Sequence, residues 1–141
     1  MADLQTSIAE LDGVLAHTAF LKPDQFKLLS CAPGECVLKI LFQLELERPG
    51  GLVSGMTLTW CRRRGDVAMW LAIMTLRGVS ETWVTTDMKT AFLRSARQED
   101  AMCTAKVLKL GRRTAYGTAQ CVGARTGLLV HPVISYAKVD P

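Results

Sequence analysis

The sequence has few of the residues that hold metal ions, build disulfide frameworks or form catalytic triads. Its 141 residues include two histidines and five cysteines, and no two cysteines stand in a CxxC pair. The cysteine count is odd, so we expect ordinary buried thiols rather than a zinc site or a disulfide framework. Neither His17 nor His131 has a Ser or Cys beside it in a triad-like setting, so we expect no metal site and no catalytic histidine.

The sequence also lacks a long apolar run and a leader pattern. Its longest near-continuous apolar run is Val67–Met74, which is far shorter than a membrane-spanning helix needs. The first residues, MADLQTSIAELDG, do not contain a basic region followed by an apolar one, as a signal peptide would. We therefore expect a cytoplasmic protein without a membrane partner.

Aromatic residues and net charge are both modest, at 6% of the chain and +4. The basic residues cluster in Arg62–Arg64 and in Lys106–Arg113, but aromatic residues do not alternate with them. Proteins that stack nucleic-acid bases combine aromatic and basic side chains, so we expect no nucleic-acid partner. The basic clusters are either solvated faces or contacts for phosphate groups.

Apolar residues make up 49% of the chain, which is enough for a core in a single domain over residues 1–141. Apolar residues at helical spacing predict a helix within residues 1–20 and a long central helix within residues 53–78. Alternating and β-branched segments predict six strands, whose short turns favour antiparallel pairing. The order predicts an α+β fold with the sheet wrapped around the long helix. The expected elements are the helix Asp3–His17, strands Phe26–Cys31 and Glu35–Leu46, the long helix, and strands Thr82–Phe92, Met102–Leu110, Ala115–Val122 and Leu128–Val139.

One carboxylate interrupts the apolar part of the long helix. Asp66 leads into Val67–Met74, where burying a charge is costly unless a partner or a reaction uses it. Upstream, Ser54-Gly55 is where the helix would begin, and a free backbone N–H there would support a developing oxyanion. Together these groups suit acyl transfer. The alternative is that Asp66 caps the helix half Val67–Leu76 after a break at Gly65.

Three segments carry a resemblance to a known family. The first is Val53-Ser54-Gly55 with Asp66–Met69, the second runs from Val84–Met88 to Arg94, and the third is Lys106–Arg113. Taken together, they resemble the hotdog fold and, more closely, the PaaI-like (phenylacetate-degradation) acyl-CoA thioesterases. The resemblance covers most of the chain, and it implies an antiparallel sheet wrapped around a long central helix.

The resemblance also implies the catalytic residues. Gly55 matches the glycine whose N–H binds the thioester carbonyl, and Asp66 matches the carboxylate that activates water or attacks the carbonyl itself. Thr85 matches a hydroxyl that helps to place the water, with a plain strand residue as the alternative. Ser54 stands where many members have His, and Asp66 follows it by twelve residues instead of nine. Three extra residues advance a helix by about 4.5 Å, so we expect a bulge or a broken turn near Gly65.

The substrate and the partners follow from the same resemblance. Arg94, Arg112 and Arg113 lie in segments that border the coenzyme A channel, and Ser54 would hydrogen-bond the substrate or stabilise its turn. We expect an acyl-CoA thioesterase that needs no cofactor because CoA is part of the substrate, and the resemblance implies an aromatic acyl group such as phenylacetyl. Its pocket would lie between the subunits of a homodimer or a dimer-of-dimers tetramer. The alternatives are a non-catalytic acyl-CoA-binding hotdog protein and a hydratase, whose paired Asp and His are absent here.

Overall fold

A computed structural model describes residues 4–17, 26–41, 47–48, 52–53 and 55–140, with the backbone alone for residues 17, 26, 47–48, 52–53 and 55–64. The helices and strands follow one another in the predicted order, with a short additional strand pair before the long helix. The elements are α1 (Ile8–His17), β1 (Phe26–Ala32), β2 (Glu35–Ile40), β3 (Glu47–Arg48), β4 (Leu52–Val53), α2 (Gly55–Arg77), β5 (Thr82–Phe92), β6 (Ala101–Leu110), β7 (Thr114–Gly123) and β8 (Gly127–Val139).

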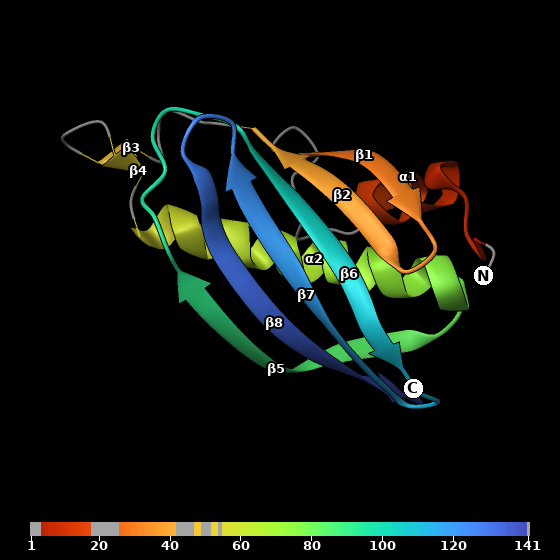
Figure 1. Cartoon of the computed structure of the whole chain (residues 1–141). Helices are drawn as coiled ribbons and strands as arrows, with labels where there is room; N and C mark the ends of the chain where they lie inside the picture. The colour runs from red at the N-terminus through yellow and green to blue at the C-terminus, as the bar shows by residue number, and fades with distance from the viewer. Residues whose placement is uncertain (1–3, 18–25, 42–46, 49–51, 54, 141) are drawn as a thin grey trace.

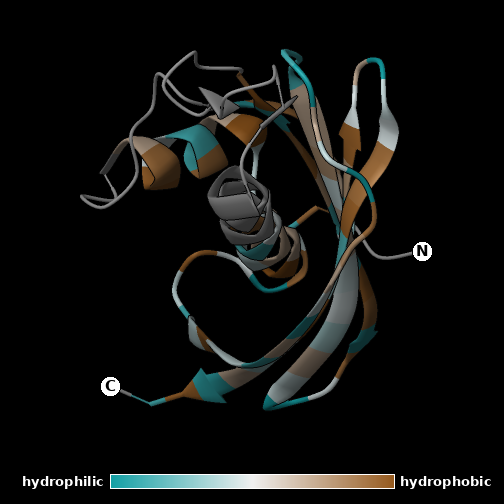
Figure 2. Ribbon diagram, turned by 90° about the vertical axis from the view of Figure 1, so that its left-hand side faces the viewer, coloured by the Kyte–Doolittle hydropathy of each residue, from teal (hydrophilic) through white to brown (hydrophobic). Residues whose placement is uncertain are grey.

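Six strands form one antiparallel sheet in the order β1-β2-β6-β7-β8-β5 (Figure 1). The sheet curves, and α2 lies along its concave side (Figure 2). The predicted α+β fold is therefore confirmed. The four strands after α2 begin and end within one residue of the predicted positions, because their β-branched and aromatic residues and the turns between them mark their limits.

The first helix is shorter than predicted. It begins at Ile8 rather than Asp3, because Ser7 caps it: the Ser7 hydroxyl accepts from the Glu10 N–H at 3.2 Å, and the Glu10 carboxylate accepts from the Ser7 N–H at 3.3 Å. The strand predicted as Glu35–Leu46 is regular only to Ile40, and residues 42–46 lie outside the described part of the chain.

The middle of α2 is buried on nearly all sides, which explains why its apolar run has no polar face. Every residue from Val67 to Thr75 except Trp70 is buried. The sheet covers one side, and the N-terminal segment crosses the last turns, where the Thr6 hydroxyl donates to the Met74 carbonyl at 2.7 Å. The buried Thr75 hydroxyl donates to a carbonyl of its own helix and accepts a backbone N–H from the β1–β2 turn, so it is fully paired.

The bulge or broken turn expected near Gly65 is wrong, because α2 is continuous from Gly55 to Arg77. Gly65 instead permits close packing: a Cβ atom there would lie 3.1 Å from the Ala119 Cβ and 3.3 Å from the Pro132 Cγ. Asp66 therefore lies inside a helix that rests against β7 and β8, and it does not cap a helix.

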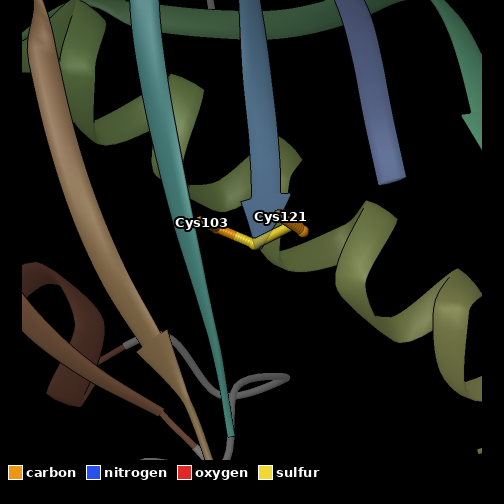
Figure 3. The surroundings of a disulfide bond; sticks show 2 residues. All are labelled: Cys103 and Cys121. Atoms are coloured by element: carbon orange, nitrogen blue, oxygen red, sulfur yellow. A yellow bond between two sulfur atoms is a disulfide. The ribbon is translucent and has the colours of Figure 1, made fainter. Parts of the chain in front are cut away.

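A disulfide joins Cys103 in β6 to Cys121 in β7 (Figure 3). The two residues are direct partners in the antiparallel register, and both are fully buried. The expectation of unpaired thiols is wrong for this pair, because the spacing of cysteines along a sequence does not reveal which ones face each other across a sheet. Cys31 and Cys36 are free thiols.

Gly117→Ala tests the close packing of α2. A Cβ atom at Gly117 would clash with the Lys106 carbonyl and lie 2.5 Å from the Met69 Cε, so we expect a loss of about 1–3 kcal/mol in the free energy of unfolding. Gly13→Ala in α1 is the matched control, because it meets no atom within 4 Å and should stabilise the helix by about 0.5–1 kcal/mol. Urea unfolding followed by circular dichroism measures both, and a Gly117→Ala protein as stable as the wild type would contradict this packing.

Glu99 joins the β5–β6 connection to the β7–β8 turn. Its carboxylate accepts the backbone N–H groups of Arg97, Arg125 and Thr126 at 3.0–3.2 Å, together with the Thr126 hydroxyl. Partial burial acts to raise the pKa of Glu99, but the hydrogen bonds to its charged form outweigh burial, and the pKa is lowered.

We expect Glu99→Gln to lower the melting temperature at neutral pH and the difference from wild type to shrink on acidification. Because the folded pKa is lowered, the stabilisation is complete above the unfolded value of 4.5 and is lost as the pH falls through the folded pKa. Thermal unfolding between about pH 3 and about pH 7 measures the effect. The exposed Asp87 supplies the control, Asp87→Asn, and a Glu99→Gln difference that does not change with pH would refute the assignment.

Candidate active site

Two hydroxyl groups meet the carboxylate of Asp66 between α2 and the sheet. The Thr85 hydroxyl in β5 donates to Oδ1 of Asp66 at 2.9 Å. The Tyr136 hydroxyl in β8 lies 2.5 Å from the same oxygen and 2.8 Å from the Asp66 carbonyl oxygen. Three elements therefore converge on one side chain.

The register of the sheet brings the two hydroxyls together. Thr85 and Tyr136 are direct partners in the β5–β8 ladder. Just after Thr85 the register shifts, so that Thr86 is an extra residue in β5, and its hydroxyl donates to the Ser135 carbonyl at 3.2 Å. Such bulges redirect side chains and are common beside functional sites.

Tyr136 is a hydrogen-bond donor throughout the physiological pH range. Its side chain is buried, with 4% of its surface exposed. Burial raises the pKa of Tyr136, and the negative charge of Asp66 raises it further, so the phenol keeps its proton. Among the described residues, Oδ2 of Asp66 has no hydrogen-bond partner, and that oxygen is available to a ligand or a water molecule.

The Asp66 carboxylate stands at one wall of a pocket of about 300 Å³. Most of the pocket wall is apolar, and the polar groups are those of the Asp66 cluster. Small-molecule sites commonly combine apolar walls with a few convergent polar groups. The lining residues are Asp66, Val67, Trp70, Trp83, Val84, Thr85 and Tyr136.

A charged network holds the indole of Trp83 in the pocket wall. The Trp83 Nε1–H donates to Glu81 at 3.0 Å, and Arg77 and Lys138 lie 3.7 and 3.5 Å from the same carboxylate. Arg77 also lies 5.6 Å from the centre of the indole ring. Burial acts to raise the pKa of Glu81, but the Trp83 hydrogen bond and the two cations outweigh it, so the pKa is lowered.

The predicted oxyanion donor is far from Asp66 within one chain. Gly55 is the first residue of α2, and Asp66 lies eleven residues further along the same continuous helix. At 1.5 Å per residue the two are about 16 Å apart along the axis, so they cannot face one carbonyl unless they belong to different copies. Ser54 lies outside the described residues, and so do the side chains of Arg62–Arg64.

The predicted arginines lie at opposite ends of β5. Arg94 lies two residues beyond the end of β5 and donates to the Leu128 carbonyl at 2.9 Å. Arg112 and Arg113 lie in the β6–β7 turn beside Lys138, which pairs with Trp83 near the start of β5. Arg113 also forms a 3.0 Å ion pair with Asp140. Eleven strand residues span about 35 Å, so one chain does not gather these arginines into one site.

Comparisons with known proteins agree with the fold. Residues 55–123, just under half of the chain, match the family model described as Thioesterase superfamily. The structure of zebrafish thioesterase superfamily member 2 is 27% identical, covers 97% of this chain and 99% of its own, and superposes with a TM-score of 0.71. The chain has the hotdog fold. No curated protein matches the sequence significantly.

Two bacterial structures with this hotdog fold are also similar. A thioesterase from Haemophilus influenzae is 14% identical over 99% of this chain and 96% of its own, with a TM-score of 0.76. A hypothetical thioesterase protein with coenzyme A from Streptococcus pneumoniae is 10% identical over 94% and 97%, with a TM-score of 0.73. At these identities the similarity supports the fold alone.

Tyr136 is the site residue that sequence reasoning missed. It occupies a buried position of β8, two residues beyond the fully buried Ile134, and such a position reads as an ordinary core residue. Alternation alone shows that it faces inward, but the pairing with Thr85 depends on the register.

Within the described residues, no His, Cys, Asp or Glu side chains gather into a group of three or more that would hold a metal ion, and neither helix has the length and apolarity to cross a membrane.

Proposed function

We propose that this chain hydrolyses an acyl-CoA thioester to a free acid and CoA. One observation carries the proposal: Asp66 lines a mostly apolar pocket, with one carboxylate oxygen held by two hydroxyls and the other without a hydrogen bond from any described residue. The match of residues 55–123 to the Thioesterase superfamily supports the same reaction. As part of the same proposal, we place the chain in the PaaI-like group of thioesterases.

Asp66 would act through Oδ2, the carboxylate oxygen that accepts no hydrogen bond from the described residues. As a general base, Oδ2 takes a proton from a water molecule while the water oxygen attacks the thioester carbonyl. The carbon–sulfur bond then breaks, CoA leaves with its sulfur, and the acid keeps the water oxygen. As a nucleophile, Asp66 would instead form a mixed anhydride that water hydrolyses. Thr85, which touches the carboxylate and lines the pocket, is well placed to orient the water in either route.

A second copy of the chain would complete the site. Gly55 would supply the N–H that stabilises the oxyanion, and in one chain it is about 16 Å from Asp66 along the helix. β5 is an edge strand of the sheet, and its outer side pairs with no strand of the described chain (Figure 1). Edge strands of this length favour pairing with another chain. An antiparallel β5–β5 contact would also bring the Arg94 end of one copy beside the Arg112 end of the other.

The pocket suits an apolar, planar acyl group. Two indoles, those of Trp70 and Trp83, line it, and aromatic rings pack well against such walls. The pocket volume of about 300 Å³ accommodates an acyl group but not the whole of CoA, so the CoA moiety would extend outward. Arg94, Arg112 and Arg113 would bind its phosphates across the two copies. CoA is part of the substrate, and the proposed reaction needs no cofactor.

Asp66→Asn tests the proposal. The amide keeps the shape of the side chain but cannot accept the proton of water, so we expect release of CoA to fall by about 100-fold or more. A panel of aliphatic and aromatic acyl-CoAs with a thiol-reactive dye measures the rate. Asp87→Asn is the matched control and should keep the wild-type rate, because Asp87 is exposed in β5 on the other side of the bulge.

Hydrolysis that survives unchanged in Asp66→Asn would refute the mechanism. The alternative function, acyl-CoA binding without turnover, is favoured by the uninterrupted eleven-residue separation of Gly55 and Asp66 in α2. Saturable binding of acyl-CoA by calorimetry, with no CoA release across the panel, would establish that alternative.

We expect the active form to be a dimer. Because the proposed oxyanion donor and the proposed base come from different copies, specific activity should fall by about half at the concentration where half of the protein is monomeric. Analytical ultracentrifugation gives that concentration, and stopped-flow assays over the same range give the activity. A monomer with constant specific activity would contradict the shared site.

A further inference from the structure

The Tyr136 hydroxyl bridges two oxygens of the same residue. It lies 2.5 Å from the carboxylate Oδ1 of Asp66 and 2.8 Å from the main-chain carbonyl of Asp66. A phenol hydroxyl that contacts both the carboxylate and the main-chain carbonyl of one residue restricts the side-chain torsions of that residue. Rotation of the carboxylate would break the contact. The geometry points to Tyr136 as the positioning residue for Asp66, an inference that rests on the proposed function.

The surroundings of the phenol support a positioning role. Tyr136 is buried between α2, β7 and β5, with its backbone paired to Thr85 on one side and Ala115 on the other. The ring therefore has little freedom to move away from Asp66. The tyrosine holds its proton strongly, because burial and the Asp66 charge raise the pKa of Tyr136, so it donates to the carboxylate without transferring the proton.

The hydrogen bonds from Thr85 and Tyr136 give the two carboxylate oxygens of Asp66 different roles. Both hydroxyls reach Oδ1, and neither reaches Oδ2. Oδ1, which accepts both hydrogen bonds, is thereby fixed as an anchor, and Oδ2 is left for the reaction in the pocket that Asp66 lines. Supporting hydrogen bonds of this kind keep a reacting group in its productive orientation. Tyr136 thus acts through Asp66 and need not touch the acyl-CoA.

Tyr136→Phe removes the single hydroxyl oxygen and leaves the ring. We expect kcat to fall by about tenfold with KM changed less than about twofold, since the hydroxyl orients the base and the ring that lines the pocket is kept. The acidic limb of the kcat profile should move to higher pH, because the charged carboxylate loses a donor. Tyr116→Phe is the matched control: Tyr116 is the other tyrosine of the chain, is 47% exposed in β7, and should behave as wild type.

Thr85→Val and Thr85→Ser provide an internal comparison. Thr85→Val should move the acidic limb in the same direction as Tyr136→Phe, and Thr85→Ser, which keeps a hydroxyl, should restore it. A purely structural role for Tyr136 would change stability without moving the pH profile. Wild-type kcat and an unmoved acidic limb in Tyr136→Phe would therefore overturn the inference.

If Tyr136→Phe does not fold, a second variant tests the inference. It carries 3-fluorotyrosine at position 136 and is made in the Tyr116→Phe background. The fluorinated phenol is a stronger donor of nearly the same size, so the acidic limb should move to lower pH. An unmoved limb would count against the inference.

Failure of the proposed function is recognised separately. If the wild type releases no CoA, melting temperatures of Tyr136→Phe, Asp66→Ala and the double variant still report the contact. Non-additive losses would support the Tyr136–Asp66 pairing even though the chain is not a hydrolase. Additive losses would overturn the inference whether or not the wild type hydrolyses acyl-CoA.

Discussion

The close packing of α2 against the sheet is the constraint on which the rest of the structure depends. Gly65 in the helix and Gly117 in β7 lack side chains at the points where the two layers meet, and a carbon atom at either position would push them apart. Protein interiors are packed as densely as crystals, so such a shift would spread through the whole layer. Because Asp66 follows Gly65 directly, the same packing sets the depth at which its carboxylate meets β5 and β8.

The partly buried carboxylate of Asp66 needs hydrogen bonds to offset the loss of water, and the described residues supply them unequally to its two oxygens. Two hydroxyls satisfy one oxygen of Asp66, and no described residue bonds the other. Nearby, Glu81 and its cations fix the indole of Trp83 in the apolar wall. In the proposed hydrolysis, rigid walls and one available carboxylate oxygen would lower the cost of reaching the transition state, since these groups are ordered when the protein folds.

The sequence predicted what depends on local patterns and missed what depends on register. The four strands after α2 were located to within one residue by their β-branched and aromatic residues and by the turn residues between them. These local patterns could not show that Thr85 lies opposite Tyr136, or Cys103 opposite Cys121, since pairing joins residues distant in the chain. A break near Gly65 was expected from the three extra residues between Ser54 and Asp66, whereas the helix is continuous there and Gly65 serves close packing through its missing side chain.

The bulge in β5 separates the strand into two halves of opposite phase. Before Thr86 the odd-numbered Trp83 and Thr85 line the pocket, and after it the even-numbered Met88 turns toward the core. Because Thr86 is the extra residue, loss of its codon would leave a regular strand in which Thr85 still pairs with Tyr136 and Met88 still pairs with Ile134. A lineage of this gene would therefore tolerate loss of position 86 more readily than loss of Val84, which would move Thr85 out of register with Tyr136.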